Sequence, residues 1–211
     1  MTEAAQHCVP ADVAPLALRN AAERDRWAAI THEENSVDIH ALIESLTTGQ
    51  HETYPPATEQ DIKTTEQAIG YALPYSFKAF LQGFSNGAYL YLLQEVSAVG
   101  VGNPQILPIQ DIEWLKGEPS ERIPIREGGE TRLGNLIPFG LDANGNAWCF
   151  VTDLQSENGE YVVYYFNTSG RKLYSKIESF ARWLEILTDK QDEVIRTLYD
   201  DAVLSEELNL G

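Results

Sequence analysis

The sequence predicts an α+β fold in which helices pack against a mostly antiparallel β-sheet. Apolar residues recur at helical spacing up to about residue 85. Short β-rich runs separated by Gly, Asn, Asp and Pro follow to about residue 170, and helical spacing then returns. Helices followed by hairpins and a closing helix are typical of a sheet that helices cover on one side.

Residues 1–53 are expected to form a helical N-terminal extension. The segment from Leu16 to Ile30 is rich in Ala and Arg, and Ser36 can cap a second helix that Gly49 ends. The apolar face of that second helix comprises Ile39, Leu42, Ile43 and Leu46. Because Pro55 and Pro56 disfavour helix, we place a boundary there and expect the main domain to span residues 54–187.

Two more helices are predicted at the start of the main domain. The Thr58 hydroxyl can accept a hydrogen bond from the Asp61 amide, a capping-box start for a helix that runs to Gly70. The next helix opens at Leu73-Pro74, since proline is tolerated in a first turn, and it ends before Asn86-Gly87. Its apolar stripe comprises Phe77, Phe80, Leu81 and Phe84.

Five strands are predicted after these helices, at residues 88–93, 105–109, 136–139, 147–152 and 161–167. Asn144-Gly145 and Asn158-Gly159 separate the last three, and Asn-Gly pairs readily take positive φ. Both connections therefore predict antiparallel hairpins.

A closing helix is predicted from Ser175, with Glu178 at the capping-box position. Apolar residues of this helix recur at the spacing expected for packing on a sheet: Ile177, Phe180, Ala181, Leu184 and Leu187. Residues 188–211 are expected to form a C-terminal amphipathic acidic helix. Its apolar face comprises Val194, Ile195, Leu198, Tyr199, Ala202 and Leu208, and it could pack on the protein itself or bind a partner.

The charge of the chain restricts its partners. There are 15 Lys and Arg against 32 Asp and Glu, which gives a net charge of −17. Nucleic acid and anionic membrane surfaces would be repelled, whereas a basic protein would be attracted. Acidity that serves solubility alone is the other interpretation.

A cytoplasmic location is expected. No window reaches the roughly 18 uninterrupted apolar residues of a membrane helix, and Met1 to Pro10 has neither the basic cluster nor the apolar run of a secretory signal. The two cysteines, Cys8 and Cys149, are not expected to form a disulfide, and Cys149 is expected to be a buried apolar residue.

Histidine is confined to the first 51 residues, at His7, His32, His40 and His51. The expected main domain therefore cannot assemble Ser-His or Cys-His nucleophilic machinery or a zinc site of His and Cys ligands. No phosphate-binding loop of the Walker type is present. Asp142, Asn144 and Asn146 resemble the opening of a calcium loop, but Ala147 replaces the required glycine, so a hairpin turn is favoured. We expect no enzymatic activity, no cofactor and no required metal.

Four carboxylates in or beside the two hairpin turns are the candidate functional residues: Asp142, Asp153, Glu157 and Glu160. They could act as a general acid and base, which would make the chain a carboxylate-only enzyme. Between residues 132 and 170 only Arg132 opposes them as a fixed positive charge, so a negative surface that binds a partner is the simpler interpretation.

The order of these motifs resembles the SUKH superfamily. Its first half is seen in Ala57 to Ile62, Ile69-Gly70 and Leu73-Pro74-Tyr75, with Asn86-Gly87 after the second helix. Ile137-Pro138-Phe139-Gly140, Asp142, Gly145-Asn146, Asp153, Val162-Val163 and Ser179-Phe180 are similar to its second half. The resemblance covers about residues 54 to 187, and it implies an α+β fold without a cofactor.

This superfamily includes a fungal regulator of cell-wall assembly and bacterial immunity proteins that neutralise toxins, many of them nucleases. The resemblance implies action by binding, with Asp142 and Asp153 as the matched polar positions. We therefore expect an immunity protein that binds a basic toxin. The alternatives are an intracellular regulatory scaffold and, third, a carboxylate-only enzyme.

Overall fold

The computed structural model describes residues 37–90, 105–111, 115–141, 145–156 and 159–189, and every structural statement below concerns these residues. They contain four α-helices: α2 (Ile39–Thr47), α3 (Glu59–Ile69), α4 (Tyr75–Gly83) and α5 (Phe180–Asp189). The strands and helices together confirm the α+β fold class predicted from the sequence.

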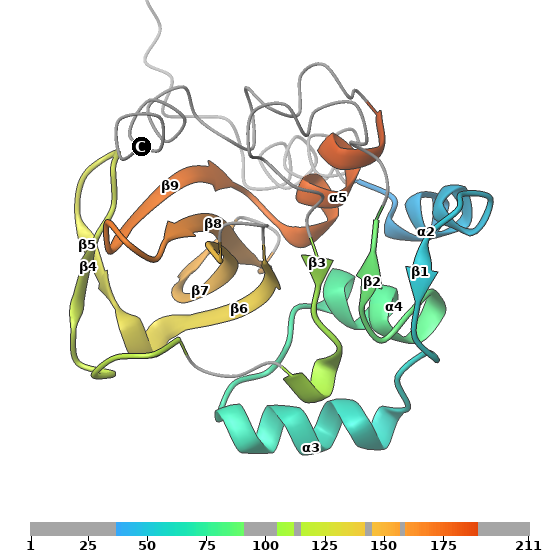
Figure 1. Ribbon diagram of the computed structural model, residues 1–211, viewed down its shortest axis with the longest axis horizontal. Coiled ribbons are helices and arrows are strands. Elements are labelled where there is room, and N and C mark those ends of the chain that lie inside the picture. The colour runs from blue at the N-terminus through green and yellow to red at the C-terminus, as the bar shows by residue number, and fades with distance from the viewer. Residues whose placement is uncertain (1–36, 91–104, 112–114, 142–144, 157–158, 190–211) are drawn as a thin grey trace, which may run out of the picture. The chain divides into compact units, whose positions relative to one another are not determined.

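The main sheet is antiparallel at every pairing, in the order β1-β2-β3-β6-β7-β8-β9 (Figure 1). Its strands are β1 (Glu52–Thr53), β2 (Ala88–Tyr89), β3 (Gln105–Ile106), β6 (Leu136–Leu141), β7 (Ala147–Gln155), β8 (Tyr161–Asn167) and β9 (Lys172–Ile177). A separate two-stranded ribbon consists of β4 (Arg122–Pro124) and β5 (Glu130–Arg132). The two predicted hairpins, β6–β7 and β7–β8, are confirmed as antiparallel.

The helix starts follow the sequence closely. The predicted capping box is present at α3, where the Thr58 hydroxyl accepts from the Asp61 amide and the Asp61 carboxylate accepts from the Thr58 amide at 2.8 Å. Gly70 ends the helix with φ of 76°, a conformation that glycine adopts at little cost. Asp38, rather than the expected Ser36, caps α2, because its carboxylate accepts from the His40 and Ala41 amides.

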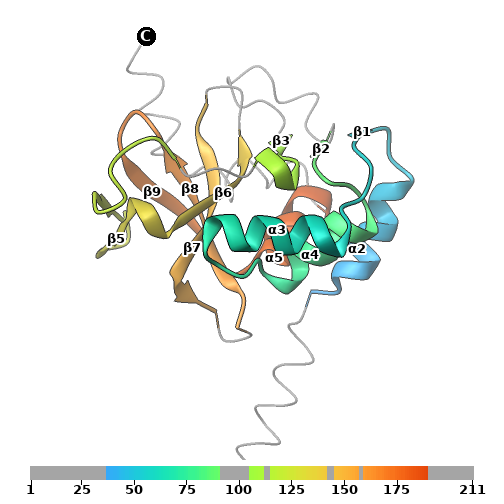
Figure 2. The ribbon, with the colours of Figure 1, turned by 90° about the horizontal axis from the view of Figure 1, so that it is seen from below.

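An aromatic core lies between the helices and one face of the sheet. α4 and α5 pack against each other, α5 also contacts β8 and β9, and Figure 2 shows these helices behind α3. The central rings are fully buried: Phe77, Phe80, Phe139, Phe150 and Phe180. Ring centroids are 4.9 Å apart for the edge-to-face pair Phe77 and Phe180, a favourable separation for aromatic rings, and 4.4 Å apart for the stacked pair Phe139 and Phe150.

The opposite face of the sheet carries a second apolar cluster. Successive side chains of a strand point to opposite faces, and Cys149, Val151, Val162 and Phe166 belong to this second cluster. Ile123 of β4 joins it, together with Leu133 and Leu173. The prediction of a sheet covered on one side is therefore corrected, because the β4–β5 ribbon packs on the face that the helices leave.

The folded unit begins earlier than residue 54. α2 buries Ile39, Ile43 and Leu46 in the aromatic core, and β1 pairs with β2. The chain divides between Ser36 and Val37, so residues 37–53 belong to the domain and are not part of a separable extension. The predicted helix at residues 16–30 and the predicted tail helix, apart from the end of α5, lie outside the described residues.

The closing helix begins at Phe180, not at Ser175. Residues 172–177 form β9, in which Ser175 has a positive φ of 57°, and Ser179 supplies the cap because its hydroxyl accepts from the Arg182 amide at 3.1 Å. Four residues of the predicted apolar face are buried on the helix, Phe180, Ala181, Leu184 and Leu187, whereas the fifth, Ile177, is buried on β9.

Candidate functional site

Asp153 anchors the β4–β5 ribbon to the sheet. It lies on β7, and its exposed carboxylate accepts hydrogen bonds from two side chains. The Thr131 hydroxyl lies 2.9 Å from both carboxylate oxygens, and the Asn135 amide donates to Oδ2 at 2.8 Å. Asp153 therefore has a structural role on the ribbon side of the sheet.

Glu160 lies on the helix side of the same hairpin end and is buried, with 9% of its surface exposed. Its carboxylate accepts from the Ser76 backbone amide at 2.9 Å and from the Ser76 hydroxyl at 2.5 Å. Ser76 is in the first turn of α4, whose N-cap residue, Pro74, makes no side-chain capping bond. Glu160 thus supplies a carboxylate to the N-terminus of α4, although it is 84 residues from Ser76 in the sequence. The helix dipole favours negative charge at this position.

The two predicted site residues that the structure describes, Asp153 and Glu160, do not share one surface. Asp142 and Glu157 lie outside the described residues, and Glu160 is buried. Leu141, just before Asp142, pairs with Ala147 at one end of β7, whereas Asp153 is near the other end. At about 3.3 Å per residue, the nine residues of β7 separate these ends by about 25 Å, well beyond the Debye length of about 8 Å at physiological salt.

Asp153 and Glu160 also cannot act as an acid–base pair in this arrangement. Their carboxylates bind groups on opposite sides of the sheet, Thr131 of the ribbon and Ser76 of α4. The described residues contain no group of three or more His, Cys, Asp or Glu side chains that could hold a metal ion. Cys149 is fully buried, and burial raises the pKa of its thiol well above the ordinary value.

Three tyrosines lie on the segments around the start of α4 and Glu160, and sequence reasoning did not identify them: Tyr71 in the loop before α4, Tyr75 at its start and Tyr161 after Glu160. Tyr75 is the first residue of α4 and is 64% exposed, and its hydroxyl lies 3.2 Å from His40 Nε2 of α2. Tyr161 directly follows Glu160, and burial, together with nearby Tyr71 and Glu66, raises the pKa of Tyr161. We call Tyr71, Tyr75 and Tyr161 the tyrosine face.

Polar contacts of α3 fix the surroundings of the tyrosine face. Glu66 Oε1 accepts from the Leu73 amide at 2.8 Å and from Lys78 Nζ at 3.3 Å, which ties the loop between α3 and α4 to both helices. The sequence contained a sign that these tyrosines are not core residues. Tyr71 and Tyr75 do not belong to the apolar stripe of α4. Two other aromatic residues are less accessible than Tyr75: Trp148 is fully buried and Tyr89 is half-buried.

The two helices, the antiparallel hairpins and the closing helix occur in the order and spacing that the motifs predicted. The family model described as the SMI1/KNR4 family (SUKH-1) matches residues 56–186. The chain belongs to the SMI1/KNR4 family. A search of curated proteins finds no match to it.

The SUKH-1 match and the folded unit differ at the N-terminal side. The match begins at Pro56, whereas α2 and β1 precede it and still contribute to the core and to the sheet. Within the match lie Asp153, Glu160 and the tyrosine face. His40, which contacts Tyr75, comes from the part of the fold that precedes the match. No described helix of this SUKH-1 chain is long and apolar enough to cross a membrane.

Proposed function

We propose that this SUKH-1 protein acts by binding another protein and that it is an immunity-type inhibitor of a basic toxin. The observation that carries the proposal is the net charge of −17 in a chain whose family is established. A strongly charged surface attracts an oppositely charged partner and accelerates association. The proposal includes no catalytic step, cofactor or metal.

The tyrosine face is the proposed docking site. Affinity in protein interfaces rests on a few anchors, and tyrosine is among the residues enriched there. Tyr75 offers a largely exposed ring, and Tyr161 lies beside the β7–β8 turn. Glu157 belongs to that turn in the sequence, so it is the candidate carboxylate that we assign to the rim of the interface. Asp153 and Glu160 support the hairpin that presents these residues.

The test is binding and inhibition with a basic toxin encoded beside the gene. The purified full-length chain should bind the toxin and suppress its activity at one-to-one stoichiometry. A chain that binds without suppressing activity would instead support the regulatory scaffold. No binding to any neighbouring gene product, together with turnover in a hydrolase panel, would overturn the proposal in favour of an enzyme.

Variants at the two ends of β7 locate the interface. Glu157→Lys should slow association, and Tyr75→Ala should accelerate dissociation, because rim charges act on the association rate and buried anchors on the lifetime. Asp142→Lys and Glu118→Lys carry the same charge change away from the tyrosine face and serve as controls. Association that slows equally in Asp142→Lys and Glu157→Lys, with Tyr75→Ala unchanged, would remove the tyrosine face as the docking site.

A further inference from the structure

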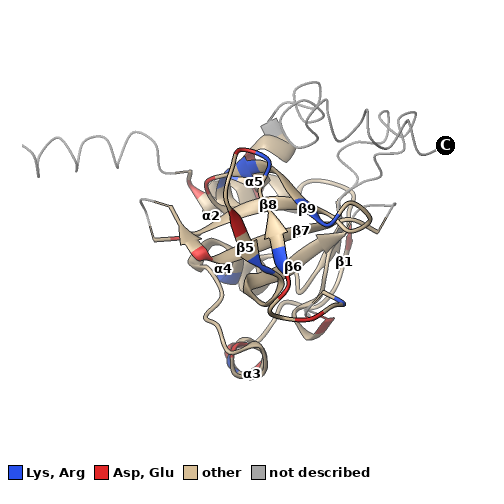
Figure 3. Cartoon of the chain, turned by 90° about the vertical axis from the view of Figure 1, so that its left-hand side faces the viewer, with Lys and Arg blue, Asp and Glu red and all other residues tan. Residues whose placement is uncertain are grey.

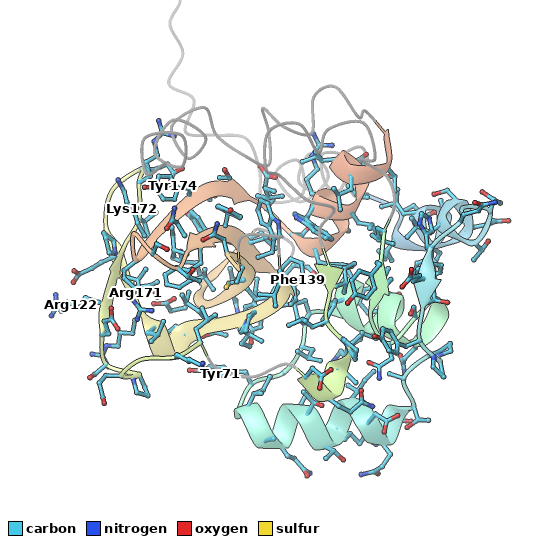
Figure 4. The ribbon with its side chains drawn as sticks, viewed as in Figure 1. Tyr71, Arg122, Phe139, Arg171, Lys172 and Tyr174 are labelled. Atoms are coloured by element: carbon cyan, nitrogen blue, oxygen red, sulfur yellow. The ribbon has the colours of Figure 1, made fainter. Side chains whose placement is uncertain are left out.

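Basic residues gather on one part of this acidic protein. Six of the 15 Lys and Arg residues occupy the β4–β5 ribbon, the loop before it and the β8–β9 turn with the start of β9, where only four carboxylates accompany them: Glu118, Glu121, Glu127 and Glu130. We call them the basic face: Lys116, Arg122, Arg126, Arg132, Arg171 and Lys172. Figure 4 shows Arg122, Arg171 and Lys172 on the same side of the molecule, and Figure 3 shows that side with Lys and Arg interspersed among Asp and Glu.

Backbone contacts bring the two segments of the basic face together. Ile125 forms a parallel bridge with Leu173, and the Arg126 amide donates to the Leu173 carbonyl at 3.0 Å. The ribbon therefore lies directly against the start of β9. Residues that are 39 or more positions apart in the sequence thus form one surface.

Arg171 makes this surface rigid. Its Nε donates to Glu121 Oε1 at 2.8 Å, a second guanidinium nitrogen pairs with the other Glu121 oxygen, and Nη1 donates to the Lys116 carbonyl at 3.2 Å. The guanidinium also lies 5.4 Å from the centre of the Phe166 ring. Four contacts on one side chain fix the loop that carries Lys116 to the turn that carries Lys172.

Two arginines face each other at the end of the ribbon away from its turn. Arg122 and Arg132 are directly opposite each other on β4 and β5, and both are exposed. Like charges in this position destabilise a β-ribbon. Glu130 forms an ion pair with Arg122, whereas Arg132 and Lys116 form none with any described carboxylate. A negatively charged group that binds here would relieve the repulsion.

Apolar surface accompanies the positive charge. Leu115 and Ile125 are half-buried, pack against the second apolar cluster and are the sequence neighbours of Lys116 and Arg126. A ligand matched to this surface would therefore combine negative charge with aliphatic side chains. A small anion would use only part of it.

We propose that the C-terminal segment of this same chain, residues 190–211, docks on the basic face. Its charged residues are six acids, Asp192, Glu193, Asp200, Asp201, Glu206 and Glu207, against Lys190 and Arg196. Between them stand the apolar residues Val194, Ile195, Leu198, Tyr199, Ala202 and Leu208. The segment thus offers both properties that the basic face requires.

The connection makes docking favourable at modest affinity. The segment starts directly after α5, which ends at Asp189. Its 22 residues can extend to about 70 Å, or about 33 Å as a helix, and a small domain is about 30 Å across. A ligand on such a tether has an effective concentration in the millimolar range, so weak contacts are enough to keep it bound. The docked segment covers the positive part of the surface, which leaves the protein more uniformly negative towards a basic partner.

A spin label on the segment tests the proposal in the full-length chain. The label is placed by Ser205→Cys in a Cys8→Ser background, and buried Cys149 is expected to stay unlabelled in the native protein. We expect broadening of the backbone amide signals of residues 122–132 and 171–173, with the signals of α3 unaffected. Salt of about 1 M, which shortens the Debye length to about 3 Å, should reduce the broadening.

Matched variants identify the contact. Arg132→Glu should lower the ratio of docked to free segment about fivefold, the effect of losing one exposed charge pair, whereas Lys63→Glu on α3 should leave it unchanged. Asp200→Lys with Asp201→Lys should restore docking in the Arg132→Glu variant. Equal broadening of α3 and the ribbon, or equal effects of Arg132→Glu and Lys63→Glu, would overturn the proposal. Broadening transferred between labelled and unlabelled molecules would also overturn it, because the occupant would then be a second copy.

Discussion

Replacing Glu160 by alanine should destabilise the whole domain, although this residue directly follows Gly159 of a hairpin turn. Its carboxylate makes two hydrogen bonds to Ser76, at 2.9 and 2.5 Å, and both residues are buried. The substitution leaves the Ser76 amide and hydroxyl without this acceptor. It also removes the negative charge from the N-terminus of α4, the helix that carries Phe77 and Phe80 into the core.

The size of the effect follows from these two bonds. A hydrogen bond to a charged group contributes about 1.5–3 kcal/mol net, and a buried donor left unpaired costs about 1–3 kcal/mol. Because the two bonds share one carboxylate and the Ser76 hydroxyl can rotate to another acceptor, we expect a loss of about 2–4 kcal/mol. Glu160→Gln keeps one acceptor oxygen and loses the charge, so about 1–2 kcal/mol is expected.

Urea unfolding of the full-length chain measures these losses, with the free energy extrapolated to water. Glu178→Ala, at an exposed glutamate, is the matched control and should stay within about 0.5 kcal/mol of the parent. Ser76→Ala combined with Glu160→Ala should cost less than the sum of the single changes, since the residues are in direct contact. A Glu160→Ala loss equal to that of Glu178→Ala would refute the assignment of Glu160 as a helix anchor.

Three further predictions follow from the fold. A chain that begins at Tyr54 lacks the three buried residues of α2, each of which contributes about 1.5–3 kcal/mol to stability. Circular dichroism should show that this chain is unfolded and that a chain beginning at Val37 is folded. Hydrogen bonding from Arg171 lowers the pKa of Glu121 below its ordinary 4.5. The pair therefore stabilises the fold above this pH, and that stability is lost as the pH falls below about 4.5. Urea unfolding should show a smaller loss of stability over this range in Glu121→Gln than in the parent chain. In a Cys8→Ser background, Cys149 should react with a thiol reagent only at the rate of unfolding, and fast reaction in the native protein would contradict its burial.

The sequence predicted correctly those elements that depend only on neighbouring residues. The capping box at Thr58 and Asp61, the stop at Gly70 and the Asn-Gly hairpin connections each depend on residues a few positions apart, and all four are present where predicted. β9 was missed because Ser175 and its neighbours carry a helix-start signature, which the actual start repeats four residues later at Ser179. Pairing with β8 makes residues 172–177 a strand and leaves Ser179 as the start of the helix. That contact cannot be seen in the local sequence.

The domain boundary was misplaced for a similar reason. Pro55 and Pro56 do break regular structure, but a break between elements differs from a break between domains. α2 remains in the domain because Ile39, Ile43 and Leu46 are buried against residues that follow the prolines. Periodicity showed that this helix has an apolar face, and only the tertiary structure shows what covers that face.

The candidate site shows why a count of carboxylates is a poor guide to a binding surface. Most of the acids that the structure describes are exposed, yet the two described candidates are both engaged in hydrogen bonds that hold the fold. Strand topology adds a second constraint: in a meander, consecutive turns lie at opposite ends of the shared strand, so Asp142 and Glu157 flank opposite ends of β7. The electric field of the whole protein can attract a basic partner to either end of β7. The aromatic side chain that anchors this partner can be at only one of these ends. The exposed ring of Tyr75 favours the end where Glu160 holds α4 and the β7–β8 hairpin together.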